Sequence, residues 1–170
     1  MRIAMALIAA LVIGLTACGR KAPESRDAVS DFEHPSPKLL KDIAHKQGWQ
    51  IENVKARQRA FDALESNQQP AEEDWQRLVK AADTETNGFD LELAIMFSSH
   101  MTDKYRAPVL KWCERNMEQT ADPYAAVLGY DCYVKSGGSD RALWASRLKA
   151  RGLFYVEKIA EADRRAAARK

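Results

Sequence analysis

Histidine often acts as a catalytic residue or a metal ligand, and this sequence has three histidines, one of which follows a serine. His34, His45 and His100 are spread along the sequence, and neither a His-Glu-x-x-His nor a Cys-x-x-Cys pattern occurs. Ser99 and His100 are adjacent, so on a helix they would not face each other. No Gly-x-Ser-x-Gly elbow is present to expose a nucleophile. We therefore predict no catalytic residue, no metal site and no cofactor.

One acidic pair offers an enzymatic alternative. Glu65-Ser66 is similar to the acid–serine pair of lytic transglycosylases, which cleave peptidoglycan. Such an enzyme needs a glutamate of raised pKa inside a glycan groove, and the further motifs of that family do not follow Glu65. The acids from Glu72 to Asp74 are explained by a helix start, where negative charge is favourable.

Two cysteines, Cys113 and Cys132, flank the segment TADP at residues 120–123. Antiparallel helices joined by a short turn bring together residues equidistant from that turn. The midpoint of the two cysteines falls between Asp122 and Pro123, where we expect the turn. Whether they form a disulfide or stay two buried apolar thiols depends on the compartment in which the chain works.

The first residues, MRIAMALIAALVIGLTACG, predict that compartment. One positive charge precedes an uncharged run from Ile3 to Ala17, which is the form of a secretory signal. Residues 15–18, LTAC, resemble a bacterial lipobox. The resemblance implies removal of residues 1–17 and acylation of Cys18, and Gly19 after it implies the outer membrane, facing the periplasm. An ordinary signal peptide cut nearby is the alternative. Because export leads to an oxidising space, we expect Cys113 and Cys132 to form a disulfide.

Composition limits the partners. The sequence carries 26 basic and 24 acidic residues, and loss of the signal removes only Arg2 from these counts. The nearly neutral remainder lacks the clustered positive charge on which nucleic-acid binding depends, so we exclude nucleic acid. Residues 18–37 are rich in proline and charge, which predicts a flexible tether between the lipid and a single domain at residues 38–170.

Helical periodicity dominates that domain, and no convincing strand pattern occurs. We predict an all-α fold of six to seven helices, built either as stacked antiparallel hairpins or as an irregular bundle. Turn residues separate the predicted helices, and Pro123 takes the favoured first position of one. The final helix is predicted to run from about Ser139 towards Ala162 with a bend at Gly152.

Tryptophans recur at intervals of repeat length, at Trp75, Trp112 and Trp144. The segment KWCERNMEQTADPYAAVLGYDC is similar to the junction of two Sel-one-like repeats, which are relatives of tetratricopeptide repeats. The matching positions lie within residues 105–152 and include Leu128 and Gly129. The resemblance implies a helical array that binds another protein. In the alternative interpretation, the tryptophans are core residues of a bundle.

These features together predict a lipid-anchored envelope protein that binds other proteins without catalysis. It would be either an adaptor of an envelope assembly or an immunity protein against a toxin that reaches the periplasm. A peptidoglycan-acting enzyme and a structural tether from membrane to wall are the alternatives. Because aromatic side chains dominate interface hot spots, Tyr124, Tyr130 and Tyr133 are the expected contact residues.

Overall fold

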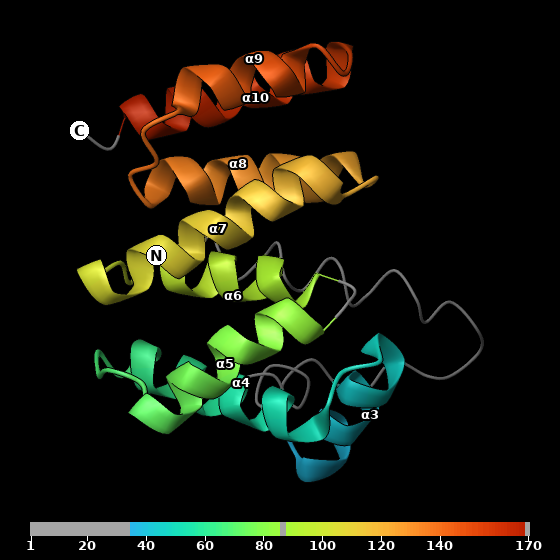
Figure 1. The fold of residues 1–170 in the computed structure, drawn as a ribbon, viewed down its shortest axis with the longest axis vertical. Coiled ribbons are helices and arrows are strands. Elements are labelled where there is room, and N and C mark those ends of the chain that lie inside the picture. Colours follow the sequence, from blue (N-terminus) through green and yellow to red (C-terminus); the bar gives the residue numbers. More distant parts are fainter. Residues whose placement is uncertain (1–34, 86–87, 169–170) are drawn as a thin grey trace, which may run out of the picture. The chain divides into compact units, whose positions relative to one another are not determined.

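The computed structural model describes residues 35–85 and 88–168 (Figure 1). The described residues form eight helices and no strand, which confirms the all-α prediction. The helices are α3 (Pro37–Gln47), α4 (Ile51–Glu65), α5 (Glu72–Thr84), α6 (Phe89–Ser98), α7 (Asp103–Gln119), α8 (Pro123–Lys135), α9 (Arg141–Lys149) and α10 (Leu153–Ala167). All eight belong to one compact unit, Pro37–Lys170. The predicted signal peptide, the predicted lipidation site Cys18 and most of the predicted tether lie outside the described residues.

Consecutive helices of this unit pack against one another from α3 to α10. The most extensive contact is between α7 and α8, and α8 also touches α6 and α10. Such neighbour-to-neighbour packing is the arrangement expected of stacked hairpins, because each hairpin leaves an apolar face for the next to cover. In Figure 1 the last three helices lie side by side with α8 next to α7.

The helix count exceeds the predicted six to seven because the last predicted helix is divided in two. Gly152 has φ of 140°, a backbone conformation that side chains rarely allow, and it separates α9 from α10. The amide of Arg151 donates to the carbonyl of Leu148, which closes the end of α9. At Gly152, where a bend was predicted, the helix ends and the chain reverses, so α10 packs back against both α9 and α8.

The three tryptophans of the sequence repeat occupy alternate helices: Trp75 is on α5, Trp112 on α7 and Trp144 on α9. All three are at most 5% exposed. Trp75 lies at the centre of an aromatic cluster whose ring centroids are 4.9 Å away at Phe97, 4.7 Å at Tyr105 and 5.9 Å at Trp112. Edge-to-face contacts of this kind add to the energy of burial. One tryptophan per hairpin is thus a core feature, and membership of the Sel-one-like family stays a prediction.

The α7–α8 hairpin forms as predicted around Asp122. The Asp122 carboxylate accepts a hydrogen bond of 2.9 Å from the amide of Tyr124, and Pro123 follows as the first helical residue. Gly129 lies against the α7 backbone, where a Cβ atom would be 3.2 Å from the carbonyl oxygen of Cys113 and 3.3 Å from Cβ of Asn116. Because Gly129 has no side chain, the two helices approach closely along this contact.

The loop between α8 and α9 is fixed on Tyr133. The amide of Asp140 donates a 3.1 Å hydrogen bond to the Tyr133 hydroxyl. A Cβ atom at Gly138 would lie 2.1 Å from the Tyr133 ring, so only glycine allows the loop to cover it. This contact sets where α9 begins. None of the described helices combines the length and the apolar character needed to cross a membrane.

Candidate binding surface on the last three helices

Large apolar side chains are exposed at one end of the fold. Among the described residues, these side chains all lie on α8, α9 or α10: Tyr124, Leu143, Leu153 and Val156. Leu153 is 87% exposed and Tyr124 is 64% exposed. Scattered exposed leucines are ordinary, but their restriction to three consecutive helices is informative.

The first turns of α8 and α10 bring part of this surface together. The rings of Tyr124 and Phe154 pack edge to face with centroids 4.9 Å apart. Leu153 precedes Phe154, and both directly follow the turn at Gly152. We call Tyr124, Leu153 and Phe154 the apolar patch. Beside it, the Arg151 guanidinium lies 6.0 Å from the centroid of the Tyr155 ring, so a cation borders the patch.

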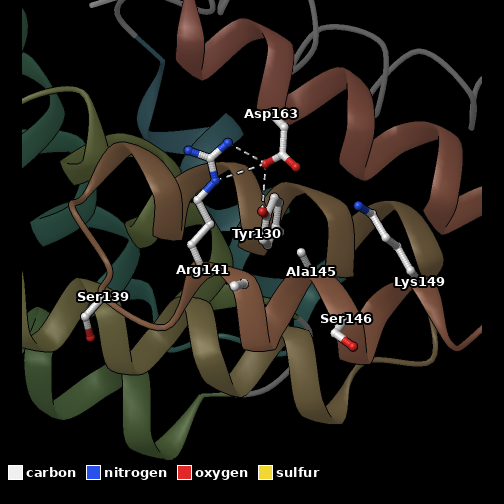
Figure 2. Close-up of a pocket in the computed structure, with 8 residues that line it drawn as sticks. Tyr130, Ser139, Arg141, Ala145, Ser146, Lys149 and Asp163 are labelled. Carbon is white, nitrogen blue, oxygen red and sulfur yellow. Dashed lines mark hydrogen bonds and ion pairs between the residues drawn. The ribbon is translucent and has the colours of Figure 1, made fainter.

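A groove of about 760 Å³ lies on the same three helices (Figure 2). Its volume is within the range of small-ligand sites, although it opens widely to solvent. Most of the groove lining comes from one side of α9, with Tyr130 contributed by α8 and Asp163 by α10. The lining residues are Tyr130, Ser139, Arg141, Ala142, Ala145, Ser146, Lys149 and Asp163.

One carboxylate organises one end of the groove. Oδ1 of Asp163 accepts hydrogen bonds from the Tyr130 hydroxyl at 2.8 Å, from Arg141 Nε at 3.1 Å and from Arg141 Nη2 at 2.8 Å. Figure 2 shows the Tyr130 and Arg141 side chains converging on that oxygen of Asp163. Burial, followed by the hydrogen bond to Asp163, raises the pKa of Tyr130 to about 12. The tyrosine is thus a neutral donor that, with the arginine, fixes the carboxylate.

The structure separates the three tyrosines named from the sequence. Tyr124 is exposed, whereas Tyr130 and Tyr133 are buried. Tyr130 reaches the groove only with the part of its ring and hydroxyl that lies beside Asp163. Tyr133 packs under the α8–α9 loop. A contact with a partner through a large side-chain area is therefore open to Tyr124 alone of the three.

Cys113 and Cys132 are both buried and lie on facing sides of α7 and α8. Both are free thiols in this structure. Interaction with the neighbouring Cys132 thiol, together with burial, raises the pKa of Cys113. The expected proximity is thus present, and the disulfide itself stays a prediction. No three metal-ligating side chains gather anywhere in residues 35–85 and 88–168.

The remaining candidates from the sequence stay apart from the groove. Glu65 ends α4 and is exposed. His100 follows the end of α6, and neither residue belongs to the groove lining. Of the residues that form the groove and the patch, Tyr124 and Tyr130 are predicted from the sequence as contact residues, but the others are not. Arg141, Ala145 and Lys149 share one helix face at intervals of four, which is a readable signal, but Asp163 reaches them from another helix.

Comparisons of the chain with protein-family models, with curated proteins and with solved structures found no match.

Proposed function

We propose that this chain is a lipid-anchored protein of the cell envelope that acts as a non-catalytic module and binds another protein through α8, α9 and α10. The envelope location rests on the LTAC motif at residues 15–18 and the signal-like run before it. Such a module would serve either as an adaptor of an envelope assembly or as an immunity protein in the periplasm. The anchor would hold the domain near the bilayer, and several acyl chains on Cys18 would make that attachment stable.

The observation that carries the binding function is the apolar patch. A side chain such as Leu153, which is 87% exposed, gains nothing from burial in the isolated chain. Contact with a partner would remove its surface from water, at about 25 cal/mol per Å² of apolar area. Aromatic and arginine side chains are also enriched in protein interfaces, and here Tyr124, Phe154 and Arg151 lie on the same helix pair or in the turn before it.

The peptidoglycan-enzyme alternative has less support. Glu65 lies at an exposed helix end and outside the groove, whereas a glycan-cleaving acid needs an enclosed site. The carboxylate that does line the groove, Asp163, is held by Arg141 and Tyr130 through one oxygen.

Site-specific crosslinking tests the binding function. A photoreactive residue replaces Leu153 in the full chain, expressed in cells that carry the native envelope, and a matched chain carries it at exposed Gln76 on α5. We expect one crosslinked protein from position 153 and none from position 76. The crosslinked protein is then purified, and its affinity is measured for the unmodified chain and for Leu153→Asp.

We expect Leu153→Asp to weaken that affinity at least about fivefold, as for an interface anchor. Equal affinity of the two chains, or equal crosslinking at both positions, would contradict binding through the patch. The anchor has a separate readout: palmitate labelling of the chain should disappear in Cys18→Ala. Unchanged labelling in that variant would remove the lipid anchor from the proposal.

A further inference from the structure

The groove on α9 has its own chemistry, distinct from that of the apolar patch. We propose that it binds an extended peptide segment carrying two carboxylates four residues apart, with Arg141 and Lys149 as their partners. The inference deepens the proposed binding function by naming the chemistry of a partner segment. It rests on the groove, however, and not on the apolar patch.

Arg141 is held ready to bind an anion. Its Nε and Nη2 atoms both donate to Oδ1 of Asp163, which the Tyr130 hydroxyl also contacts. Nη1 has no hydrogen bond to any other described residue, so it is left to donate to a ligand. A guanidinium fixed in this way loses less rotamer freedom on binding than a free one, and its flat edge suits a carboxylate. Asp163 and Tyr130 are therefore positioning residues.

Lys149 supplies the second positive charge. It lies eight residues after Arg141 on α9, which places the two Cα atoms about 12 Å apart along the helix. Among the described residues it forms no ion pair, although it is only partly exposed. Figure 2 shows Arg141 and Lys149 on either side of Tyr130. Because Lys149 has no ion pair to give up, it can bind an anionic ligand without breaking an existing contact.

The groove floor between the two cations is made of small side chains. Ala142, Ala145 and Ser146 lie along α9 there, with the edge of the Tyr130 ring beside them. An extended peptide advances about 3.3–3.6 Å per residue, and its side chains alternate between two faces. Side chains four residues apart therefore share a face and lie about 13 Å apart, close to the roughly 12 Å between the Cα atoms of the two cations. The floor leaves room for a backbone to lie close to the helix, and the spacing of the cations selects the spacing of the carboxylates.

The charge around the groove also favours an anionic ligand. The segment 139–168 contains seven basic and four acidic residues, whereas residues 51–98, which form α4 to α6, contain five basic and ten acidic residues. The nearly neutral chain is thus polarised, and the positive field lies where the groove is. An acidic segment would be attracted to this end and repelled from the other.

The experiment measures fluorescence anisotropy of a labelled peptide, Gly-Glu-Ala-Ala-Ala-Glu-Gly amide, titrated with the full chain. The matched peptide carries glutamine in place of both glutamates. The chain variants are Lys149→Gln and, as control, Lys80→Gln, which removes an exposed lysine of α5 that has no ion pair with another described residue. The Lys149 side chain has no hydrogen bond to another described residue, so Lys149→Gln should fold normally. Arg141→Gln is a second test, checked first by circular dichroism.

We expect saturable binding of the glutamate peptide in the millimolar range, weakened at least about threefold by Lys149→Gln and by Arg141→Gln. Lys80→Gln should leave the affinity unchanged, and the glutamine peptide should not bind. Equal weakening by Lys149→Gln and Lys80→Gln would mean general charge attraction and would overturn the inference, as would equal binding of both peptides or no saturation. Loss of peptide binding with crosslinking from position 153 intact would remove this inference and leave the proposed function standing.

Discussion

Two groups of aromatic side chains, one around Trp75 and one around Tyr124, differ in their surroundings more than in their contacts. Each group contains edge-to-face ring pairs with centroids about 5 Å apart. Trp75 on α5 is 3% exposed because helices pack over it, whereas Tyr124 on α8 is 64% exposed. The difference teaches that position in the array, and not residue type, decides whether an aromatic serves stability or is free for a partner.

Truncation of one ring in each group gives the largest expected contrast. Trp112→Ala removes a ring that is 1% exposed and packs on Trp75, so it should lower the free energy of unfolding by about 3–5 kcal/mol. Tyr124→Ala removes an exposed ring, and its cost should be about 1 kcal/mol or less. Urea unfolding followed by circular dichroism measures both. Similar losses in the two variants would break the comparison.

The cysteine pair joins the inner helices to the outer ones, and its oxidation state should affect both. If Cys113 and Cys132 form a disulfide after export, reduction should lower the free energy of unfolding by about 3 kcal/mol. The reason is that the bridge would close a loop of about twenty residues and so restrict the unfolded chain. The double variant Cys113→Ala, Cys132→Ala should show no response to reductant. Thiol titration of the unfolded, unreduced chain should find neither cysteine free, and two titratable thiols would contradict the bridge.

The smallest effect is a pH dependence that belongs to the outer helices. The pKa of Tyr130 is raised to about 12 in the folded chain, above the ordinary value near 10, so its stabilising contribution is complete below pH 10 and is lost as pH rises towards 12. Between these values stability should fall by at most about 1.4 kcal/mol per pH unit from this residue. Tyr130→Phe should remove that slope, measured by urea unfolding at several pH values, and an unchanged slope would assign it elsewhere.

The sequence was sufficient for features that are decided within a few residues. Asp122 and Pro123 start α8 through a local hydrogen bond and a preset backbone angle, and both can be read from residue types. Helical periodicity likewise predicted the all-α class. Gly152 was recognised as an interruption, but its neighbours do not say whether the chain bends or turns back. That outcome depends on contacts of α10 with α8, such as Phe154 with Tyr124.

The groove shows why the candidate site is harder to predict from the sequence than the fold class is. Arg141 and Asp163 are 22 residues apart and meet only because α9 and α10 turn around Gly152. The three tyrosines between residues 124 and 133 have the same chemistry, and only the packing of α7, α9 and α10 around α8 separates the exposed Tyr124 from the buried Tyr130 and Tyr133. Long-range contacts of this kind leave no periodic signal in one chain.

At Gly129, the close packing of α7 against α8 depends on the absence of a side chain. A methyl group there would press on the Cys113 carbonyl at 3.2 Å, and the neighbouring atoms would have to yield by a few tenths of an ångström. Cys132 lies one helical turn further along the same helix, so the spacing allowed by a lone hydrogen at residue 129 is passed on to the sulfurs. The lack of a side chain at residue 129 therefore sets how closely the two cysteines approach each other, and a disulfide between them would depend on that approach.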